Sequence, residues 1–170
     1  AALTKLGSLG VLNLEGVQTR YEDPLPLLDK IASIDKNGFV PLMQEIYSEP
    51  IKEELITRRI KEIKALGGVA AVSGTPLAAI RYRETITKAS ADIFFVQATV
   101  VSTEHIGLKG REKLDLKELC QAMKIPVVIG NCVTYEVAME LMRAGAAGIM
   151  VGIGPGAACT SRGVLGVGIP

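Results

Sequence analysis

The sequence predicts an α/β fold in which short apolar strands alternate with helices around a parallel sheet. The predicted strands read as unbroken apolar runs, a pattern typical of parallel strands that are covered on both faces. Four of them start near residues 69, 92, 125 and 147. These starts lie roughly 20–35 residues apart, which is about the length of one strand–helix unit. We therefore expect one such unit to follow another around a single sheet.

The first strand is expected over residues 9–14, after a short helical tail that ends at Gly7. Asp23 and Pro24 then begin a helix, because aspartate caps a helix and proline suits its first position. The following turns of this helix offer an apolar face.

Two further helices are expected before the second strand. A short amphipathic helix covers residues 39–47, and the clearest helix of the chain covers 51–66. In the latter, apolar residues recur at about 3.6-residue spacing, and Gly67 and Gly68 end the helix. The segment between the first two strands is therefore expected to be helical.

The rest of the chain alternates regularly. Strands are expected over 69–72, 93–96, 125–129 and 147–151, and helices over 78–89, 115–123 and 135–144. Thr134 caps the last of these helices and Gly145 ends it. A polar loop is expected over 100–113. It contains His105, the only histidine, which is expected to face solvent and to take no part in catalysis.

Composition restricts the classes of function. The chain has 170 residues, of which 48% are hydrophobic but only 4% aromatic, so we expect one domain with an aliphatic core. The net charge is +1 and no basic stripe with interleaved aromatics occurs, which argues against a nucleic-acid partner. The apolar runs are too short to span a membrane. Three cysteines without a Cys-x-x-Cys pair favour a reducing, cytoplasmic location. Because the chain begins at Ala1 without a methionine, we expect it to be a piece of a longer protein.

Two architectures fit this alternation, a doubly wound open sheet and part of a (β/α)₈ TIM barrel. A dinucleotide fingerprint of the open-sheet type needs Gly-x-Gly-x-x-Gly between an early strand and its helix, and the glycine cluster here lacks that position and spacing. We favour the barrel, present as an incomplete, five-stranded portion. Polar residues stand at the carboxyl ends of successive strands, where a barrel gathers its site. They are Asn13, Ser73, Thr75, Gln97, Thr99 and Asn131.

A glycine-rich loop after the last predicted strand ends in a cysteine. Its residues run Gly152-Ile153-Gly154-Pro155-Gly156-Ala157-Ala158-Cys159-Thr160-Ser161-Arg162. Glycine allows the backbone to approach a ligand closely, and a thiol beside such a loop can act as a nucleophile. Composition alone favours a tight turn with an inert, buried cysteine, and the order of the residues changes that interpretation. Cys120 and Cys132 are expected to belong to the core.

The order of these residues resembles the catalytic loop of the IMP dehydrogenase/GMP reductase family, whose pattern is G-x-G-P-G-S-x-C-T-T-R. Two other segments resemble strand-end motifs of that family and extend the likeness over nearly the whole chain. They are Gly130-Asn131-Cys132-Val133-Thr134 and Gly7-Ser8-Leu9-Gly10-Val11-Leu12-Asn13. The run from Asn13 to Pro24 is similar to the bacterial IMP dehydrogenase-related branch. The resemblance implies strands two to six of a TIM-barrel catalytic domain over residues 1–170.

The resemblance also implies roles for named residues. Cys159 would attack C2 of the purine ring of a bound nucleotide, with Ser161 helping to handle protons there. Ala157, Ala158 and Cys159 would contact that nucleotide. Gln97, Thr99, Asn131 and Gly152 would lie beside NAD or NADP. Carbonyl oxygens of Gly154, Gly156 and Cys159 would hold a monovalent cation, usually potassium.

Several positions depart from the family pattern. Ala157 replaces a serine that contacts the nucleotide phosphate, Met150 replaces an arginine often found before the loop, and Gln97 replaces an aspartate that faces the nicotinamide ribose. An amide does not reproduce the two acceptor oxygens of a carboxylate toward ribose hydroxyls. The insert over 15–68 is also too short for the tandem regulatory pair of CBS domains that many IMP dehydrogenases carry.

Three functions follow as hypotheses. The first is NAD-dependent oxidation of IMP to XMP through a covalent cysteine adduct, which would place the protein in purine metabolism and GMP biosynthesis. The second is NADPH-dependent conversion of GMP to IMP and ammonia by a GMP reductase. The third is a non-catalytic barrel that binds purine nucleotides. In each case the partner is a purine nucleotide monophosphate (IMP, XMP or GMP), and the full-length protein is expected to form a homo-oligomer.

Overall fold

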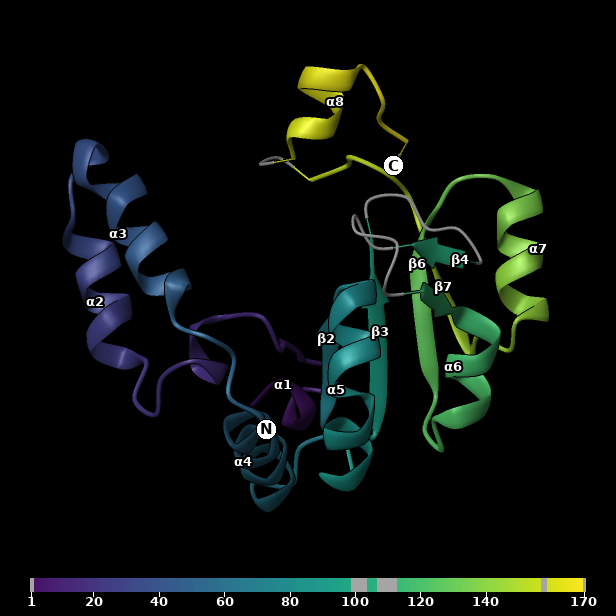
Figure 1. Ribbon diagram of the computed structural model, residues 1–170, viewed down its shortest axis with the longest axis horizontal. Helices are drawn as coiled ribbons and strands as arrows, with labels where there is room; N and C mark the ends of the chain where they lie inside the picture. Colours follow the sequence, from purple (N-terminus) through teal and green to yellow (C-terminus); the bar gives the residue numbers. More distant parts are fainter. Residues whose placement is uncertain (1, 99–103, 107–112, 157–158, 170) are drawn as a thin grey trace.

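A parallel sheet of five strands forms the centre of the fold (Figure 1). The computed structural model describes residues 2–98, 104–106, 113–156 and 159–169. The strand order in the sheet follows the chain, with each strand parallel to its neighbours. The strands are β1 (Val11–Asn13), β2 (Ala71–Gly74), β3 (Ile93–Gln97), β6 (Val127–Cys132) and β7 (Gly148–Val151). The predicted α/β class is confirmed.

Helices connect these strands as the alternation predicts. They are α1 (Ala2–Lys5), η1 (Val17–Thr19), α2 (Leu25–Ser33), α3 (Lys36–Ser48), α4 (Glu53–Ala65), α5 (Pro76–Lys88), α6 (Leu116–Ala122), α7 (Tyr135–Arg143) and α8 (Thr160–Leu165). Side-chain caps fix several starts: Thr75, Asp115 and Thr134 each accept hydrogen bonds from first-turn amides. Within the described residues, no helix combines the length and apolar character that a membrane crossing needs.

The main core lies between the sheet and the helices α4 to α7. Phe94, Val96 and Ile129 are fully buried on the strands, and Ile60 and Leu141 are fully buried on the helices facing them. Burying each of these aliphatic or aromatic side chains contributes about 1.5–3 kcal/mol of hydrophobic free energy. The expected aliphatic core is therefore present on this face.

The opposite face of the sheet differs from the expectation that both faces would be covered. Burial alternates along β3, where Phe94 and Val96 are buried but Ile93 and Phe95 are only partly buried. In a closed barrel this second face points to the interior, where side chains from the other strands pack against it. The unbroken apolar runs of these strands thus reflect a sheet with two apolar faces. Helices of this chain cover one of the two faces.

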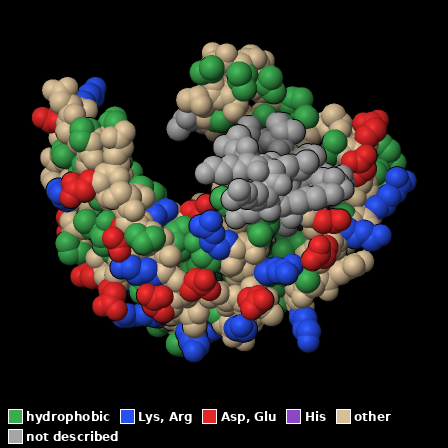
Figure 2. Space-filling model, in the orientation of Figure 1, with side chains coloured by type: hydrophobic (Ala, Val, Ile, Leu, Met, Phe, Trp, Pro, Cys, Tyr) green, Lys and Arg blue, Asp and Glu red, His purple; other side chains and the backbone are tan. Residues whose placement is uncertain are grey.

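The helices α2 and α3 form an arm at the left of Figure 1, away from the sheet. A second, smaller cluster holds them together, formed by Val17, Leu42 and Ile46 with partly buried neighbours. In Figure 2 the arm and α8 stand apart across an open hollow. The segment between the first two strands is helical, as predicted, but α3 starts at Lys36, three residues before the predicted start, and continues through Pro41.

The polar loop predicted over 100–113 is wrong in part. Residues 104–106 form β4 (Glu104–Ile106) and pair antiparallel with β5 (Lys113–Asp115), where Glu104 lies opposite Asp115. Little apolar alternation marks these residues, which is why a loop was the expectation. The side chain of His105 lies outside the described residues. Two helices, η1 and α8, were also not predicted.

Candidate active site

The glycine-rich loop leaves β7 and is joined to the end of the described chain. Ile153 and Ile169 form an antiparallel bridge with N–H···O distances of 2.7 and 2.6 Å. Gly154 has φ +72°, and a β-carbon there would lie 2.9 Å from the carbonyl oxygen of Val167. A side chain at this position would therefore be both strained and crowded, which explains the glycine.

Cys159 stands at the beginning of α8, as the residue that precedes the helix. Its backbone N–H donates to the Gly156 carbonyl at 3.0 Å, and its side chain is exposed. The pKa of the thiol is lowered, first by hydrogen bonding to the side chain and backbone of Ser161 and then by the charge of Arg162. Cys159 and Ser161, the two predicted catalytic residues, are thus hydrogen-bonded to each other. A lowered pKa increases the fraction of thiolate, which is the nucleophilic form.

A cavity of about 360 Å³ lies between this loop and the carboxyl ends of β3 and β6. This volume is of the size that small-ligand sites occupy. Its lining is mixed polar and apolar, and it brings together five predicted site residues from three parts of the sequence. The lining residues are Gln97, Ala98, Asn131, Ile153, Gly154, Pro155, Cys159 and Ser161. The alternative of a buried cysteine in this turn is wrong, because the side chain of Cys159 is exposed.

Asn131 reaches the cavity because β6 bulges at its end. Gly130 pairs with Met150 and Cys132 with Val151, so Asn131 is the extra residue between them. Its backbone N–H donates to the Ala98 carbonyl at 2.8 Å, and its side-chain Nδ2 donates to the Gly152 carbonyl at 2.8 Å. The side chain thus connects the end of β6 to the first residue of the catalytic loop.

Other predicted site residues take different places. Gly152 does not line the cavity, but its carbonyl accepts a hydrogen bond from Asn131, which does. The carbonyl of Gly156 accepts the Cys159 N–H. Thr99, Ala157 and Ala158 lie outside the described residues. Sequence reasoning did not single out Ala98, Ile153 and Pro155, which line the cavity. The last two lie inside the loop motif, so the motif itself was the signal for them.

The polar residues at the ends of β1 and β2 take part in local contacts of the strand ends. Ser73 is buried, and its carbonyl accepts the Leu14 N–H at 2.8 Å. Asn13 accepts the backbone N–H of Glu15 with Oδ1 at 2.8 Å. Thr75 is exposed and is bonded to the carboxylate of Glu15. These three residues do not line the cavity that contains Cys159.

The loop offers carbonyl oxygens to a metal ion in place of charged side chains. Among the residues that the structure describes, no three His, Cys, Asp or Glu side chains gather into a possible metal site. Uncharged oxygen ligands suit a monovalent cation better than zinc or another transition metal. A monovalent cation at the carbonyls of Gly154, Gly156 and Cys159 therefore stays a prediction.

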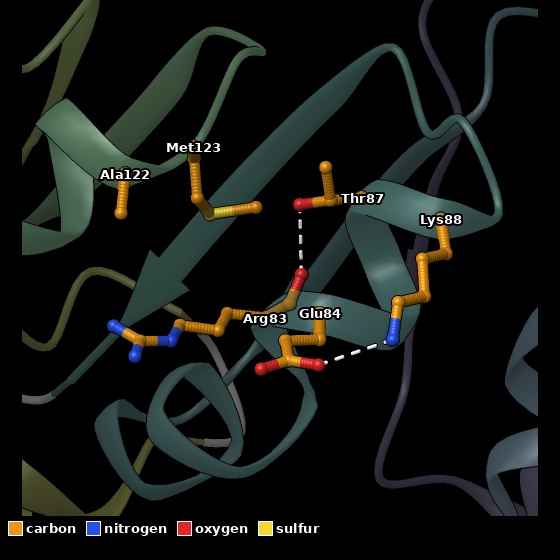
Figure 3. Close-up of a pocket in the computed structure, with 6 residues that line it drawn as sticks. All are labelled: Arg83, Glu84, Thr87, Lys88, Ala122 and Met123. Atoms are coloured by element: carbon orange, nitrogen blue, oxygen red, sulfur yellow. Dashed lines mark hydrogen bonds and ion pairs between the residues drawn. The ribbon is translucent and has the colours of Figure 1, made fainter.

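A second cavity, of about 280 Å³, lies on the outer surface between α5 and α6 (Figure 3). Met123 and Ala122 form one wall, while Arg83, Glu84, Thr87 and Lys88 form the other. Its charged groups already have partners: Lys88 pairs with Glu84 at 3.1 Å, and Arg83 pairs with Glu118 at 3.4 Å. The cavity contains none of the predicted site residues.

The chain matches one known protein family over nearly its whole length. The family model described as the IMP dehydrogenase / GMP reductase domain matches residues 3–170. The chain belongs to the IMP dehydrogenase/GMP reductase family. The resemblance of the cysteine loop and of the two strand-end motifs is thereby confirmed at the level of the family.

Two relatives show the extent of this membership. An uncharacterised oxidoreductase of Mycolicibacterium smegmatis is 31% identical over 172 residues, which covers 98% of this chain and 46% of that protein. An inosine-5′-monophosphate dehydrogenase of Cryptosporidium parvum is 56% identical over 55 residues, or 32% of this chain and 14% of that protein. This member of the IMP dehydrogenase/GMP reductase family thus spans about half the length of the full-coverage relative.

A solved structure of the same family confirms the fold. The crystal structure of an IMP dehydrogenase/GMP reductase-like protein from Corynebacterium glutamicum superposes with a TM-score of 0.84 and 30% identity. The match covers 98% of this chain and 43% of that one. The five parallel strands and their helices are therefore a portion of the family's (β/α)₈ barrel, as the sequence predicted.

Proposed function

We propose that the full-length protein is a purine nucleotide oxidoreductase that oxidises IMP to XMP with NAD, through a covalent adduct on Cys159. One observation carries the proposal: an exposed thiol of lowered pKa lies at a cavity whose walls are strand ends of a barrel. In such barrels the carboxyl ends of the strands form the active site. Family membership supports the reaction class.

The chemistry assigns distinct tasks to Cys159 and Ser161. The Cys159 thiolate forms a bond to C2 of the purine, and the hydride on C2 leaves to the nicotinamide. Water then adds to C2, the C2–sulfur bond breaks, and the thiolate returns as XMP is released with one proton. Ser161, which hydrogen-bonds Cys159, stabilises the thiolate before attack and again when it leaves.

The proposed partners of the site follow from its walls. Gln97, Asn131 and Gly152 would lie beside the dinucleotide, which accepts the hydride when bound. Asn131 keeps the Gly152 carbonyl fixed at 2.8 Å and so keeps the loop in place. Carbonyls of Gly154, Gly156 and Cys159 would hold a potassium ion. We also propose a cytoplasmic homo-oligomer.

GMP reductase is the second candidate, because Gln97 lines the cavity where the family pattern has an aspartate. An amide both donates and accepts hydrogen bonds, so it presents a different face to the cofactor. A non-catalytic nucleotide-binding barrel is the candidate of another class. The activated thiol argues against it, since binding alone does not need one.

The deciding experiment supplies the full-length protein with IMP plus NAD and, separately, with GMP plus NADPH. The absorbance of the reduced nicotinamide is followed in both cases. We expect reduction of NAD with IMP, and we expect Cys159→Ala to lower kcat by roughly a thousandfold or more. Cys120→Ala is the matched control, because that thiol is half-buried against the core.

Each outcome selects one function. Oxidation of NADPH with GMP, without NAD reduction, would establish the reductase. Nucleotide binding without turnover in either assay would establish the binding protein. Turnover that survives Cys159→Ala would exclude the covalent step.

A further inference from the structure

A carboxylate near the end of β1 holds the turn that follows β2. Glu15 accepts the backbone N–H of Thr75 at 2.8 Å with Oε2 and the Thr75 hydroxyl at 3.1 Å with Oε1. The two residues are 60 positions apart in the chain. Thr75 is also the cap of α5, a helix of 13 residues without an acidic residue in its first turn. Glu15 thus supplies the negative charge that favours the start of a helix.

Glu15 is itself held in place by its neighbours. Its backbone N–H donates to Asn13 Oδ1 at 2.8 Å, and its carbonyl accepts from the Arg20 guanidinium at 3.4 Å. That guanidinium lies over the ring of Tyr47 at 5.1 Å and also donates to the Tyr47 carbonyl at 3.2 Å. These contacts fix the backbone from which the Glu15 side chain reaches Thr75.

The Thr75 hydroxyl has a defined polarity as a result. It donates its only proton to Glu15 and accepts the Ala78 N–H at 3.3 Å. One lone pair of this exposed hydroxyl is left over, so Thr75 can act toward a ligand only as an acceptor. Without Glu15 the hydroxyl would be free to rotate and to donate.

Thr75 and Gln97 each follow one residue of the last registered pair of β2 and β3. Gly74, where β2 ends, pairs with Val96, so both residues lie at the carboxyl end of the sheet on adjacent strands. Gln97 lines the cavity that contains Cys159. A ligand that extends from the thiol along the strand ends meets Gln97 and then Thr75.

We infer that Glu15 is a positioning residue of the site: it fixes Thr75 as a hydrogen-bond acceptor for a hydroxyl group of the ligand. The inference rests on the proposed function, in which that ligand is a dinucleotide with ribose hydroxyls. Glu15 does not contact the reacting atoms, and its effect passes through Thr75.

The test is a double-mutant cycle in the full-length protein with Glu15→Ala, Thr75→Val and the two combined. We expect Glu15→Ala to raise the KM for NAD about tenfold while kcat changes less than about twofold, because Cys159 lies at the other end of the row of strands. Glu15→Gln keeps one acceptor oxygen for the Thr75 N–H but turns an NH2 donor toward the Thr75 hydroxyl, so it should lose affinity as Glu15→Ala does. In the Thr75→Val background the loss on Glu15→Ala disappears.

The control is Glu22→Gln, whose side chain is 81% exposed and reaches only Arg58, at 3.9 Å, among the described ion pairs. Additive effects, an equal change in kcat and KM, or the same change in Glu22→Gln would overturn the inference. If neither IMP with NAD nor GMP with NADPH is turned over, the proposed function fails. The double-mutant cycle is then measured as the affinity of the wild type and each variant for ADP-ribose, by calorimetric titration. Absent binding of ADP-ribose to the wild type, or additivity in its binding, also overturns it. Far-UV circular dichroism and thermal denaturation report whether each variant keeps the fold.

Discussion

The side-chain amide of Asn131 donates to the backbone carbonyl of Gly152 at 2.8 Å, across the ends of two adjacent strands. Asn131 is the bulged residue of β6, and Gly152 is the first residue after β7. The loop that contains the reactive cysteine therefore starts from a fixed point.

Replacing this amide should loosen the start of the loop. We expect Asn131→Ala to lower the free energy of unfolding by about 1–2 kcal/mol, because the Gly152 carbonyl loses its donor at a half-buried site. The loss in kcat/KM, expressed as a free energy, should exceed the loss in the free energy of unfolding, since the loop also carries the thiol. Chemical denaturation and steady-state kinetics measure the two effects. Asn37→Ala is the control, because Asn37 is exposed on α3 and bonds through its backbone N–H; equal effects of both variants would contradict this role.

The lowered pKa of Cys159 should be visible in its reactivity. The thiolate then forms at lower pH than for a free cysteine, whose pKa is about 8.5. We expect the rate of alkylation by iodoacetamide to reach half its maximum below that pH. Ser161→Ala should raise this midpoint, because the hydrogen bond to Ser161 is the main cause of the shift. Mass spectrometry of the labelled peptides follows the reaction.

Cys120 provides the internal comparison for that measurement. Burial raises the pKa of its thiol, so at neutral pH it should react far more slowly than Cys159. Equal alkylation of both peptides, or a midpoint unaffected by Ser161→Ala, would disprove the activation of Cys159.

Gly130 should not tolerate a side chain. A β-carbon there would lie 2.5 Å from the β-carbon and 2.7 Å from the carbonyl oxygen of Met150 on the adjacent strand. We expect Gly130→Ala to destabilise the protein by about 1–3 kcal/mol, because the strands must separate. Gly163→Ala is the control: nothing lies within 4 Å of that position, on α8, and alanine favours a helix. Thermal denaturation of both variants tests the contrast, which would fail if Gly130→Ala melts like the wild type.

Asp92 should give stability that depends on pH. Its pKa is lowered by the hydrogen bond from Lys64 at 2.7 Å and by the Ala70 N–H at 2.8 Å. A folded-state pKa below the unfolded value means that this stability is present above about pH 3.9 and is lost as pH falls through the folded value. Asp92→Asn should therefore cost up to about 1 kcal/mol at neutral pH, a small value because the pair is partly exposed.

The difference in the free energy of unfolding between the wild type and Asp92→Asn should shrink as the pH falls from about 4 to about 3. Urea denaturation at a series of pH values measures it. Asp29→Asn, at an exposed position on α2, is the matched control. A constant difference across the series would refute the assignment to Asp92.

The sequence predicted the order of strands and helices well because the signals were local. Thr134 and Asp115 cap helices, and the glycines at 67 and 145 have positive φ at helix ends, as expected. The cysteine loop was recognised from residue order, and it does lie at the strand ends.

Other features depend on contacts between distant residues and could not be predicted. The bond between Glu15 and Thr75 joins positions 60 apart, and nothing in either neighbourhood indicates the other. The pairing of β4 with β5 likewise lacks an apolar alternation. The separate cluster under α2 and α3 is set by how those helices fold back on η1, and local periodicity does not contain that information.

The bridge between Ile153 and Ile169 closes the cysteine loop into a ring of backbone, with the thiol part-way around it. A loop whose ends are already joined has lost its loop-closure entropy before any ligand arrives. Binding then needs to order fewer residues, so more of the contact energy is retained as affinity. Weakening the bridge would consequently act on ligand affinity as well as on stability, although neither isoleucine carries reactive chemistry.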